Sequence, residues 1–118
     1  MTYEYARLMN QESQIAKFVE GGDIDFSEPF VKVLTLADAK GLEFPFIAIV
    51  GMHSDTFPGD LTEILEEERE VVLSQKKRML YVGCSRATRA LLVTKPTKNP
   101  SEFIDLLREP LWEQRRSY

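Results

Sequence analysis

The stretch FVKVLTLADAKGLEFPFIAIVG, residues 30–51, contains two apolar runs on either side of a short turn. Phe30–Leu36 and Phe46–Gly51 are rich in β-branched and aromatic residues, which favours β-strands. The second run is apolar almost throughout, as in strands that are covered on both faces in α/β sheets. Between them, Ala37–Phe44 contains the turn signal Lys40-Gly41. We therefore expect two strands, covered on both faces and joined by a short turn.

Helical patterns lie on both sides of these strands. Apolar residues recur near a helical period over Tyr3–Glu20, which predicts one or two helices. The same period recurs over Leu61–Ser74, and Ser74 is suited to cap a further helix over Gln75–Arg86. We interpret the acidic run Glu66–Glu70 as a solvated helix face.

The C-terminal part predicts one strand and one helix. Leu91–Thr94 has the composition of a short strand. Ser101 is suited to cap a helix over Glu102–Arg108, which Pro110 ends. The order helix, strand, strand, helix, strand, helix predicts an α/β fold in which helices pack on a sheet.

The composition is that of a globular chain with one core. A length of 118 residues suits a single domain, and 29% charged and 43% hydrophobic residues are far from disordered or membrane compositions. Phe44–Met52, the longest apolar stretch, is too short to cross a bilayer. Cys84 is the single cysteine and His53 the single histidine, which leaves no intramolecular disulfide and no evident metal site. We expect a cytoplasmic protein without a membrane partner.

The net charge of −4 argues against a freestanding nucleic-acid-binding module. Such modules usually carry a basic surface that releases counterions from phosphates. The charge does not exclude a domain that grips one strand together with partner domains, because that domain needs only a local positive rim.

Two segments carry the functional argument. The first is TLADAKGLEF, residues 35–44, which is followed by the strand FIAIVGM, residues 46–52, and by TFP, residues 56–58. The second is QKKRMLYVGCSRA, residues 75–87, which is followed by TRAL.

The first segment resembles motif V of the superfamily 1 DNA helicases of the UvrD/Rep type, a T-x-H-x-x-K-G-L-E-[FW] turn followed by a buried strand and a loop ending in F-P. The second resembles motif VI, E-E-x-R-R-L-x-Y-V-[AG]-x-[TS]-R-A. Both stand in the family's order and cover Val31 to about Thr94. The resemblance implies a partial α/β domain of the RecA-like, P-loop NTPase type, with a mostly parallel sheet and flanking helices. The resemblance further implies the second, C-terminal RecA-like domain of such a helicase.

The resemblance assigns three residues to the nucleotide. Arg86 is implied to be an arginine finger, which stabilises charge on the γ-phosphate during phosphoryl transfer. Glu43 is implied to accept hydrogen bonds from the ribose. Gly41 allows a backbone geometry that brings the chain close to a ligand. The alternatives are a surface arginine, an exposed glutamate at a strand end and a plain turn glycine.

The DNA contact is implied at Thr35, Ala37 and Lys40. The hydroxyl of Thr35 and nearby amides suit the phosphate backbone of single-stranded DNA, although a threonine at a strand end is the alternative. Ala37 departs from the motif, because most relatives have a histidine there. Gln75 and Lys76 depart too, because acidic residues are usual at both positions.

Two further residues of motif VI are expected to be structural. Tyr81 lies at helical spacing with apolar neighbours, which predicts a place in the core. Cys84 is expected to be buried rather than reactive, because cysteine is among the most frequently buried residue types.

The chain contains no G-x-x-x-x-G-K-[ST] phosphate loop and no strand that ends in paired acids for Mg²⁺. The family has both in its first RecA-like domain, so ATP and Mg²⁺ are implied to bind mainly there. We therefore interpret the chain as part of a longer ATP-dependent DNA helicase, inactive alone, whose partners are single-stranded DNA and the first RecA-like domain. Within it we expect an N-terminal helical segment and loop (1–29), the RecA-like domain (30–109) and a polar tail (110–118).

Two other interpretations stay open. The chain could be a degenerate helicase-like domain that binds a protein or nucleic acid, with Ala37 and the Gln75-Lys76 pair as signs of decay. It could also belong to a helicase-nuclease of the AddA type, in which a nuclease domain follows the helicase.

Overall fold

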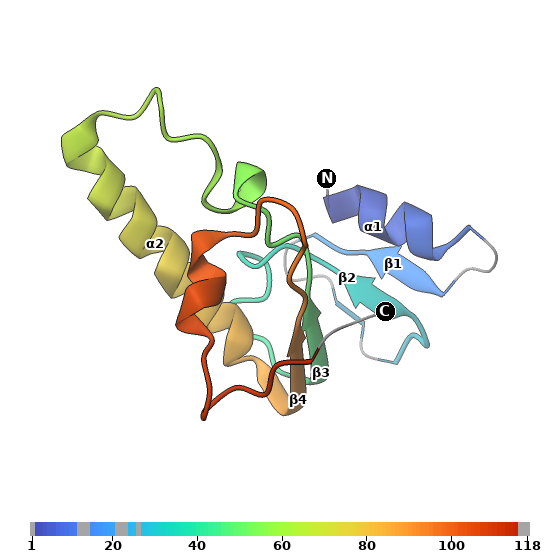
Figure 1. Cartoon of the computed structure of the whole chain (residues 1–118). Helices are drawn as coiled ribbons and strands as arrows, with labels where there is room; N and C mark the ends of the chain where they lie inside the picture. Colours follow the sequence, from blue (N-terminus) through green and yellow to red (C-terminus); the bar gives the residue numbers. More distant parts are fainter. Residues whose placement is uncertain (1, 12–14, 21–23, 26, 116–118) are drawn as a thin grey trace.

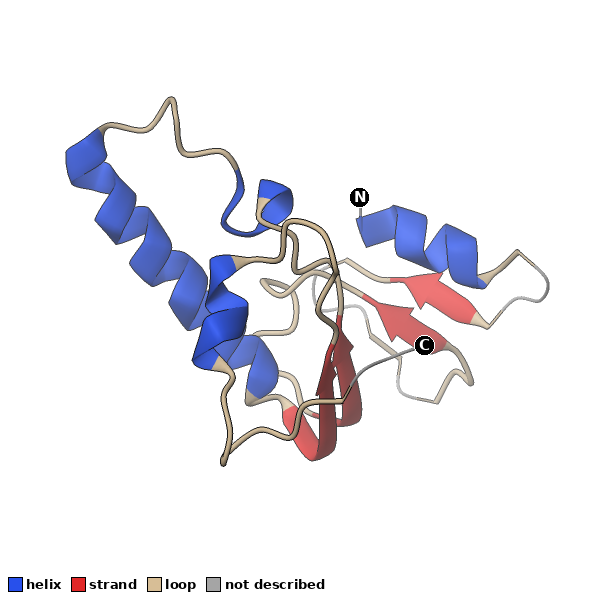
Figure 2. Ribbon diagram, in the orientation of Figure 1, coloured by secondary structure: helices blue, strands red, loops and turns tan. Residues whose placement is uncertain are grey.

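A computed structural model describes residues 2–11, 15–20, 24, 25 and 27–115 of the chain (Figure 1). The elements, in chain order, are α1 (Thr2–Met9), β1 (Ala16–Phe18), β2 (Val31–Val33), β3 (Phe44–Ile49), the helical turn η1 (Asp55–Gly59), α2 (Glu66–Cys84), β4 (Ala87–Val93) and the 3₁₀ helix η2 (Glu102–Leu106). The strands form two parallel pairs, β1 with β2 and β3 with β4. This arrangement of parallel strands and helices confirms the predicted α/β class (Figure 2).

The first strand pair includes residues that we expected to be helical. Helix α1 packs against both β1 and β2, and the side chain of Asn10 joins the end of α1 to β1 by accepting hydrogen bonds from the amides of Ile15 and Ala16. The prediction of helix over Tyr3–Glu20 is therefore wrong at β1, while residues 12–14 lie outside the described part. Pairing with β2 overrides the local helical pattern there.

The domain boundaries stay predictions. Strand β1 precedes the boundary that we expected at residue 30 and pairs with β2 beyond it. In the expected tail, residues 116–118 lie outside the described part.

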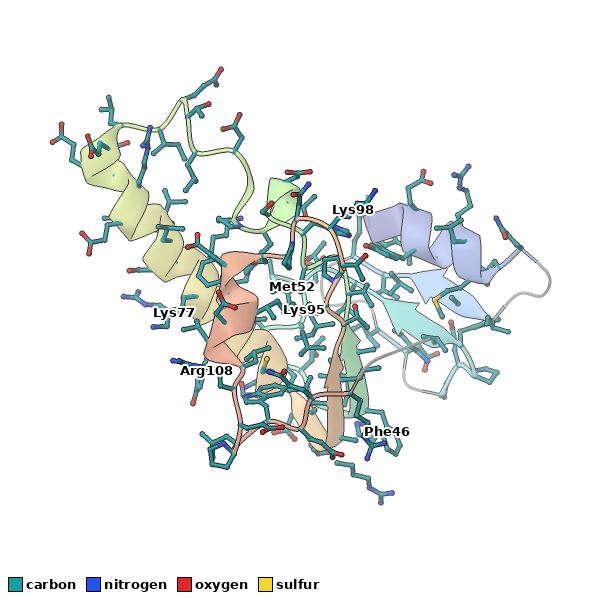
Figure 3. The ribbon with its side chains drawn as sticks, viewed as in Figure 1. Phe46, Met52, Lys77, Lys95, Lys98 and Arg108 are labelled. Carbon is teal, nitrogen blue, oxygen red and sulfur yellow. The ribbon has the colours of Figure 1, made fainter. Side chains whose placement is uncertain are left out.

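The main core lies between the β3–β4 pair, α2 and η2. Ile49 and Leu80 are buried there, and Phe57 meets Phe103 edge to face with ring centroids 5.2 Å apart. Met52, 2% exposed, lies just beyond the end of β3, in the middle of the molecule (Figure 3). These contacts fix the position of α2 against the sheet.

The opposite face of the β3–β4 pair is exposed. Phe46 is 70% exposed and Leu92 60%, and both lie on the same face because their partners in the register are Ala90 and Ala48. Figure 3 shows Phe46 at the outer edge of the molecule. The expectation that the strands are covered on both faces is wrong for the described residues, because the helices that pack against this pair cover one face.

Helix α2 is a single element from Glu66 to Cys84. The prediction of two helices with a cap at Ser74 is wrong, because Ser74 is an exposed residue inside α2. No glycine or proline interrupts the helix before Gly83, so that helix propagation is not stopped. The acidic first turn is exposed, as expected, and its charge suits the positive end of the helix dipole.

The last two elements are closer to expectation. Strand β4 begins at Ala87, four residues before the predicted strand. Ser101 caps η2 as predicted, because its Oγ accepts a hydrogen bond from the amide of Phe103 at 3.3 Å. The helix is a short 3₁₀ segment that ends at Leu106 and not at Arg108.

The C-terminal end of α2 touches the loop that follows β2. Gly83 is buried, and a Cβ atom at this position would overlap with Cδ2 of Leu36. Leu36 packs against the main core at the same place. The absence of a side chain at Gly83 therefore allows the loop to lie directly on the helix.

We expect Gly83→Val to lower the free energy of unfolding by about 2 kcal/mol, since the added methyl groups overpack this contact. Urea unfolding of the variant measures the loss. Combining it with Leu36→Ala tests the cause: the double variant should lose less than the sum of the two single variants. Additive losses would show that the two positions do not interact.

Candidate functional site

The two sequence motifs meet at the start of the parallel pair. Phe44 and Ala87 face each other in the register, and the amide of Phe44 donates a 2.8 Å hydrogen bond to the carbonyl of Arg86. Glu43 and Arg86 are the residues that immediately precede this pair of partners. The fold thus brings together two residues that are 43 positions apart in sequence.

Arg86 follows the C-terminal end of α2, and its side chain is folded back onto that end. The Nε atom donates to the carbonyl of Val82 at 3.2 Å, and Nη2 donates to Oγ of Ser85 at 3.1 Å. Arg86 is half-buried and Glu43 is exposed. Within the described part of the chain, neither of the two takes part in an ion pair. Both charges are therefore available to a ligand.

The turn between β2 and β3 is closed by its own hydrogen bonds. Oγ1 of Thr35 accepts from the amide of Asp38 at 3.1 Å and donates to its carboxylate at 3.0 Å. The amide of Ala39 donates to the carbonyl of Thr35 at 3.2 Å. The hydroxyl of Thr35 therefore holds the turn together, which the sequence alone did not indicate.

The rest of this turn presents a cation to solvent. Gly41 has φ +82°, a left-handed backbone, and a Cβ there would meet nothing within 4 Å. Glycine is required at this position by the backbone angle and not by lack of space. Ala37 and Lys40 are both exposed. The structure thus places Ala37, Lys40, Gly41 and Glu43 on one exposed turn.

Lys76 was expected to depart from motif VI, but with Tyr81 and Arg86 at the Y and R of the motif it falls on an unspecified position, and Ser74 and Gln75 stand where acidic residues are usual. The Nζ atom of Lys76 lies 5.7 Å from the ring centroid of Phe57, in the F-P loop, where a cation interacts favourably with the aromatic face. An acidic side chain at this position could not make that contact. Sequence reasoning missed it because the two residues belong to different motifs.

Tyr81 is the clearest error in the predicted core. Its side chain is 75% exposed on α2, because Leu80 and Gly83 occupy the buried side of the helix. Cys84 is half-buried and packs against the core, and burial raises the pKa of its thiol above the ordinary value.

Other kinds of site receive no support in the described ranges. No group of three or more His, Cys, Asp or Glu side chains in them is arranged to hold a metal ion. None of the helices there has the length and apolar character that a membrane span requires. Two shallow hollows, of about 400 and 660 Å³, lie beside β1–β2 and between η1 and η2, and neither is lined by Glu43 or Arg86. Glu43 is exposed, so a ligand of this residue would bind at the surface.

Comparison with known proteins identifies the family. Residues 5–98 match the model of the UvrD-like helicase C-terminal domain. The chain belongs to this family. It is 35% identical over 105 residues to DNA helicase II of Escherichia coli and of Salmonella typhimurium, and 34% identical over 107 residues to the ATP-dependent DNA helicase PcrA of Staphylococcus aureus. Each match covers 80% of this chain and 14% of the relative, so the chain corresponds to a small part of these helicases.

We expect Cys84 to react slowly with iodoacetamide, because burial raises the pKa of its thiol and the thiolate is the nucleophile. The rate should rise with pH and reach half its maximum above the midpoint of a small model thiol. Mass spectrometry of the folded chain gives the rate at each pH, and the chain in urea is the control. A folded chain that reacts as fast as the unfolded one would contradict the burial of this thiol.

Proposed function

We propose that the chain is the C-terminal motor domain of an ATP-dependent DNA helicase and that Arg86 is its arginine finger. The observation that supports this proposal is the 2.8 Å hydrogen bond from the amide of Phe44 to the carbonyl of Arg86, which joins the backbone next to Glu43 to the backbone of Arg86. Arg86 suits the phosphates and Glu43 suits the ribose of the same nucleotide. Their adjacency within a UvrD-like helicase domain supports a single nucleotide-facing surface.

The chemistry requires few groups from this domain. Negative charge on the γ-phosphate oxygens must be stabilised in the transition state of phosphoryl transfer, and a guanidinium that arrives from a second domain can provide this. Arg86 has no carboxylate partner among the described side chains. The carboxylate of Glu43 is exposed and can accept hydrogen bonds from ribose hydroxyls.

ATP and Mg²⁺ would bind mainly to a first RecA-like domain, because the sequence has neither a phosphate loop nor paired acids at a strand end. Mg²⁺ would neutralise charge between the phosphates when it is bound. In this proposal the 118-residue chain is inactive alone and provides one wall of the nucleotide cleft. In this proposal the motor would act on DNA in the cytoplasm.

Single-stranded DNA would lie across the turn between β2 and β3. Lys40 is exposed there and has no ion-pair partner among the residues described, so its charge is available to a phosphate. The hydroxyl of Thr35 is hydrogen-bonded to Asp38, so Thr35 would support the turn while its neighbours contact the DNA strand. Ala37 offers no side-chain donor, so the backbone of the turn would have to contribute.

Closing of two RecA-like domains on ATP would bring the Arg86 surface to the phosphates, and hydrolysis would release it. Domain closure of this kind would convert the cycle of ATP binding and hydrolysis into alternating grips on a DNA strand. Lys40 and Glu43 lie three residues apart on the turn that precedes β3. In this proposal a movement at the nucleotide would reach the DNA-contacting turn through this short segment.

A degenerate binding module is the second candidate, and Ala37 is the observation that favours it. The other sign of decay is weaker, because Lys76 falls on an unspecified position of motif VI and contacts Phe57. A module of this kind would bind a protein or nucleic acid without stimulating ATP hydrolysis.

We expect Arg86→Ala to reduce DNA-stimulated ATP hydrolysis at least about 100-fold in the full-length polypeptide that carries this chain, because the transition-state charge loses its partner. Steady-state phosphate release measures the loss. Arg89→Ala removes an exposed arginine three residues away on β4 and should leave turnover near wild type. Near-normal turnover of Arg86→Ala would refute the assignment. Absence of DNA-stimulated hydrolysis in the wild-type protein would favour the binding module.

We expect Lys40→Ala to raise the DNA concentration that gives half-maximal stimulation about 3- to 10-fold, with little change in turnover at saturating DNA. One phosphate contact is lost, so the salt dependence of binding should also weaken by about one unit of slope. Fluorescence anisotropy with a labelled oligonucleotide at several salt concentrations measures both effects. Lys17→Ala on β1 is the control, and an equal effect of that variant would mean that only the net charge matters.

A further inference from the structure

The guanidinium of Arg86 is held by two acceptors at the end of α2. Nε donates to the carbonyl of Val82 at 3.2 Å and Nη2 donates to Oγ of Ser85 at 3.1 Å. Ser85 is itself fixed, because its Oγ donates to the carbonyl of Val82 at 2.8 Å and its amide donates to the carbonyl of Tyr81 at 3.0 Å. The three groups form a closed ring of hydrogen bonds, in which Ser85 is the bridge.

The location of this ring has an electrostatic basis. The last carbonyls of a helix have no amide partners within the helix and carry the negative end of its dipole, which attracts a cation. The last turn of α2 contains no basic residue, and Arg86, two positions beyond the helix, supplies the charge instead. Both acceptors are neutral groups, so neither cancels the charge of the arginine.

A long arginine side chain that is free in solvent samples many rotamers and loses this freedom when it binds. The ring of hydrogen bonds already restricts the rotamers of Arg86, so less side-chain entropy is lost when a ligand binds. A phosphate oxygen is an ionised acceptor and makes a stronger hydrogen bond to a guanidinium than a carbonyl or hydroxyl does. The contacts with Val82 and Ser85 use two of the five N–H donors of the guanidinium, so a phosphate can bind the remaining donors while Ser85 keeps the arginine in place.

We propose that Ser85 is a positioning residue, whose hydroxyl holds the guanidinium of Arg86 at the end of α2 in readiness for the phosphates of a nucleoside triphosphate. This inference rests on the proposed function of Arg86. Ser85 does not touch the nucleotide and acts only through the arginine. A hydroxyl is required at this position, but its carrier can be serine or threonine, since both have a rotatable O–H that donates and accepts.

The test compares four substitutions in the full-length polypeptide, using ATP and a saturating single-stranded oligonucleotide. Ser85→Ala and Ser85→Val remove the hydroxyl, and kcat should fall about five-fold in each because one hydrogen bond to a charged group is lost. The KM for ATP should stay within about two-fold, because the arginine acts in the transition state. Ser85→Thr has nearly the shape of Ser85→Val and keeps the hydroxyl, so its kcat should equal that of the wild type. Ser74→Ala removes an exposed serine within α2, eleven residues before Ser85, and serves as the control.

A double variant separates positioning from a structural role. Ser85→Ala combined with Arg86→Ala should have the same residual turnover as Arg86→Ala alone, because Ser85 has no effect without the arginine. A further loss in the double variant would overturn the inference. So would wild-type kcat in Ser85→Val, or equal losses in Ser85→Val and Ser85→Thr. If Arg86→Ala itself is active, the proposed function fails, and this result is distinct from a failure of the Ser85 inference alone.

Discussion

The contact of Leu36 with Gly83 determines how the two motifs are arranged. Gly83 has no side chain, so the loop after β2 lies directly against the last turn of α2, and Leu36 reaches the core there. The hydroxyl of Thr35 closes the turn around this contact by accepting a hydrogen bond from Asp38. The chain then passes through Gly41 and enters β3 beside the start of β4. The hydrogen bond between Phe44 and Arg86 completes the arrangement. One end of the turn is thus fixed on the last turn of α2 and the other on Arg86. The positions of Lys40 and Glu43 follow.

The charges of the site are consistent with a surface that needs a second domain. Arg86 is bonded to neutral acceptors, Glu43 is exposed, and no described hollow encloses either of them. An enclosed nucleotide pocket would require burial of both charges, which is costly when neither has a partner. An open surface avoids this cost until a ligand and a second wall arrive together. The chain is also acidic overall, with a net charge of −4, so its affinity for DNA would depend on local cations such as Lys40.

The parts of the fold that the sequence predicted correctly are those with strong local signals. Apolar runs located β2 and β3, Ser101 gave the cap of η2, and the acidic run gave an exposed helix face. The errors arose where tertiary contacts decide. Strand β1 forms because it pairs with β2. Ser74 does not begin a new helix, because no glycine or proline interrupts α2 before Gly83. Tyr81 was expected in the core, since an aromatic at helical spacing is usually buried, but the buried side of α2 is determined by Leu36 and the sheet. In the candidate site, the motifs supplied the residues, while the ring of Ser85, Val82 and Arg86 depends on side-chain rotamers that no sequence pattern encodes.

Exposed apolar groups lie on both the β3–β4 pair and α2. Parallel strands are usually covered on both faces, yet Phe46 and Leu92 lie on an uncovered face of the β3–β4 pair. Tyr81 is exposed four residues before Ser85, on the helix whose end holds Arg86. Exposed aromatic side chains of this size are typical of surfaces that other protein segments cover. The matched relatives are about seven times longer than the region that they share with this chain, which leaves ample polypeptide for such contacts in proteins of this family. Tyr81 and Arg86 lie five residues apart at the C-terminal end of α2, so a segment that covers Tyr81 would lie near the end of the helix that holds Arg86.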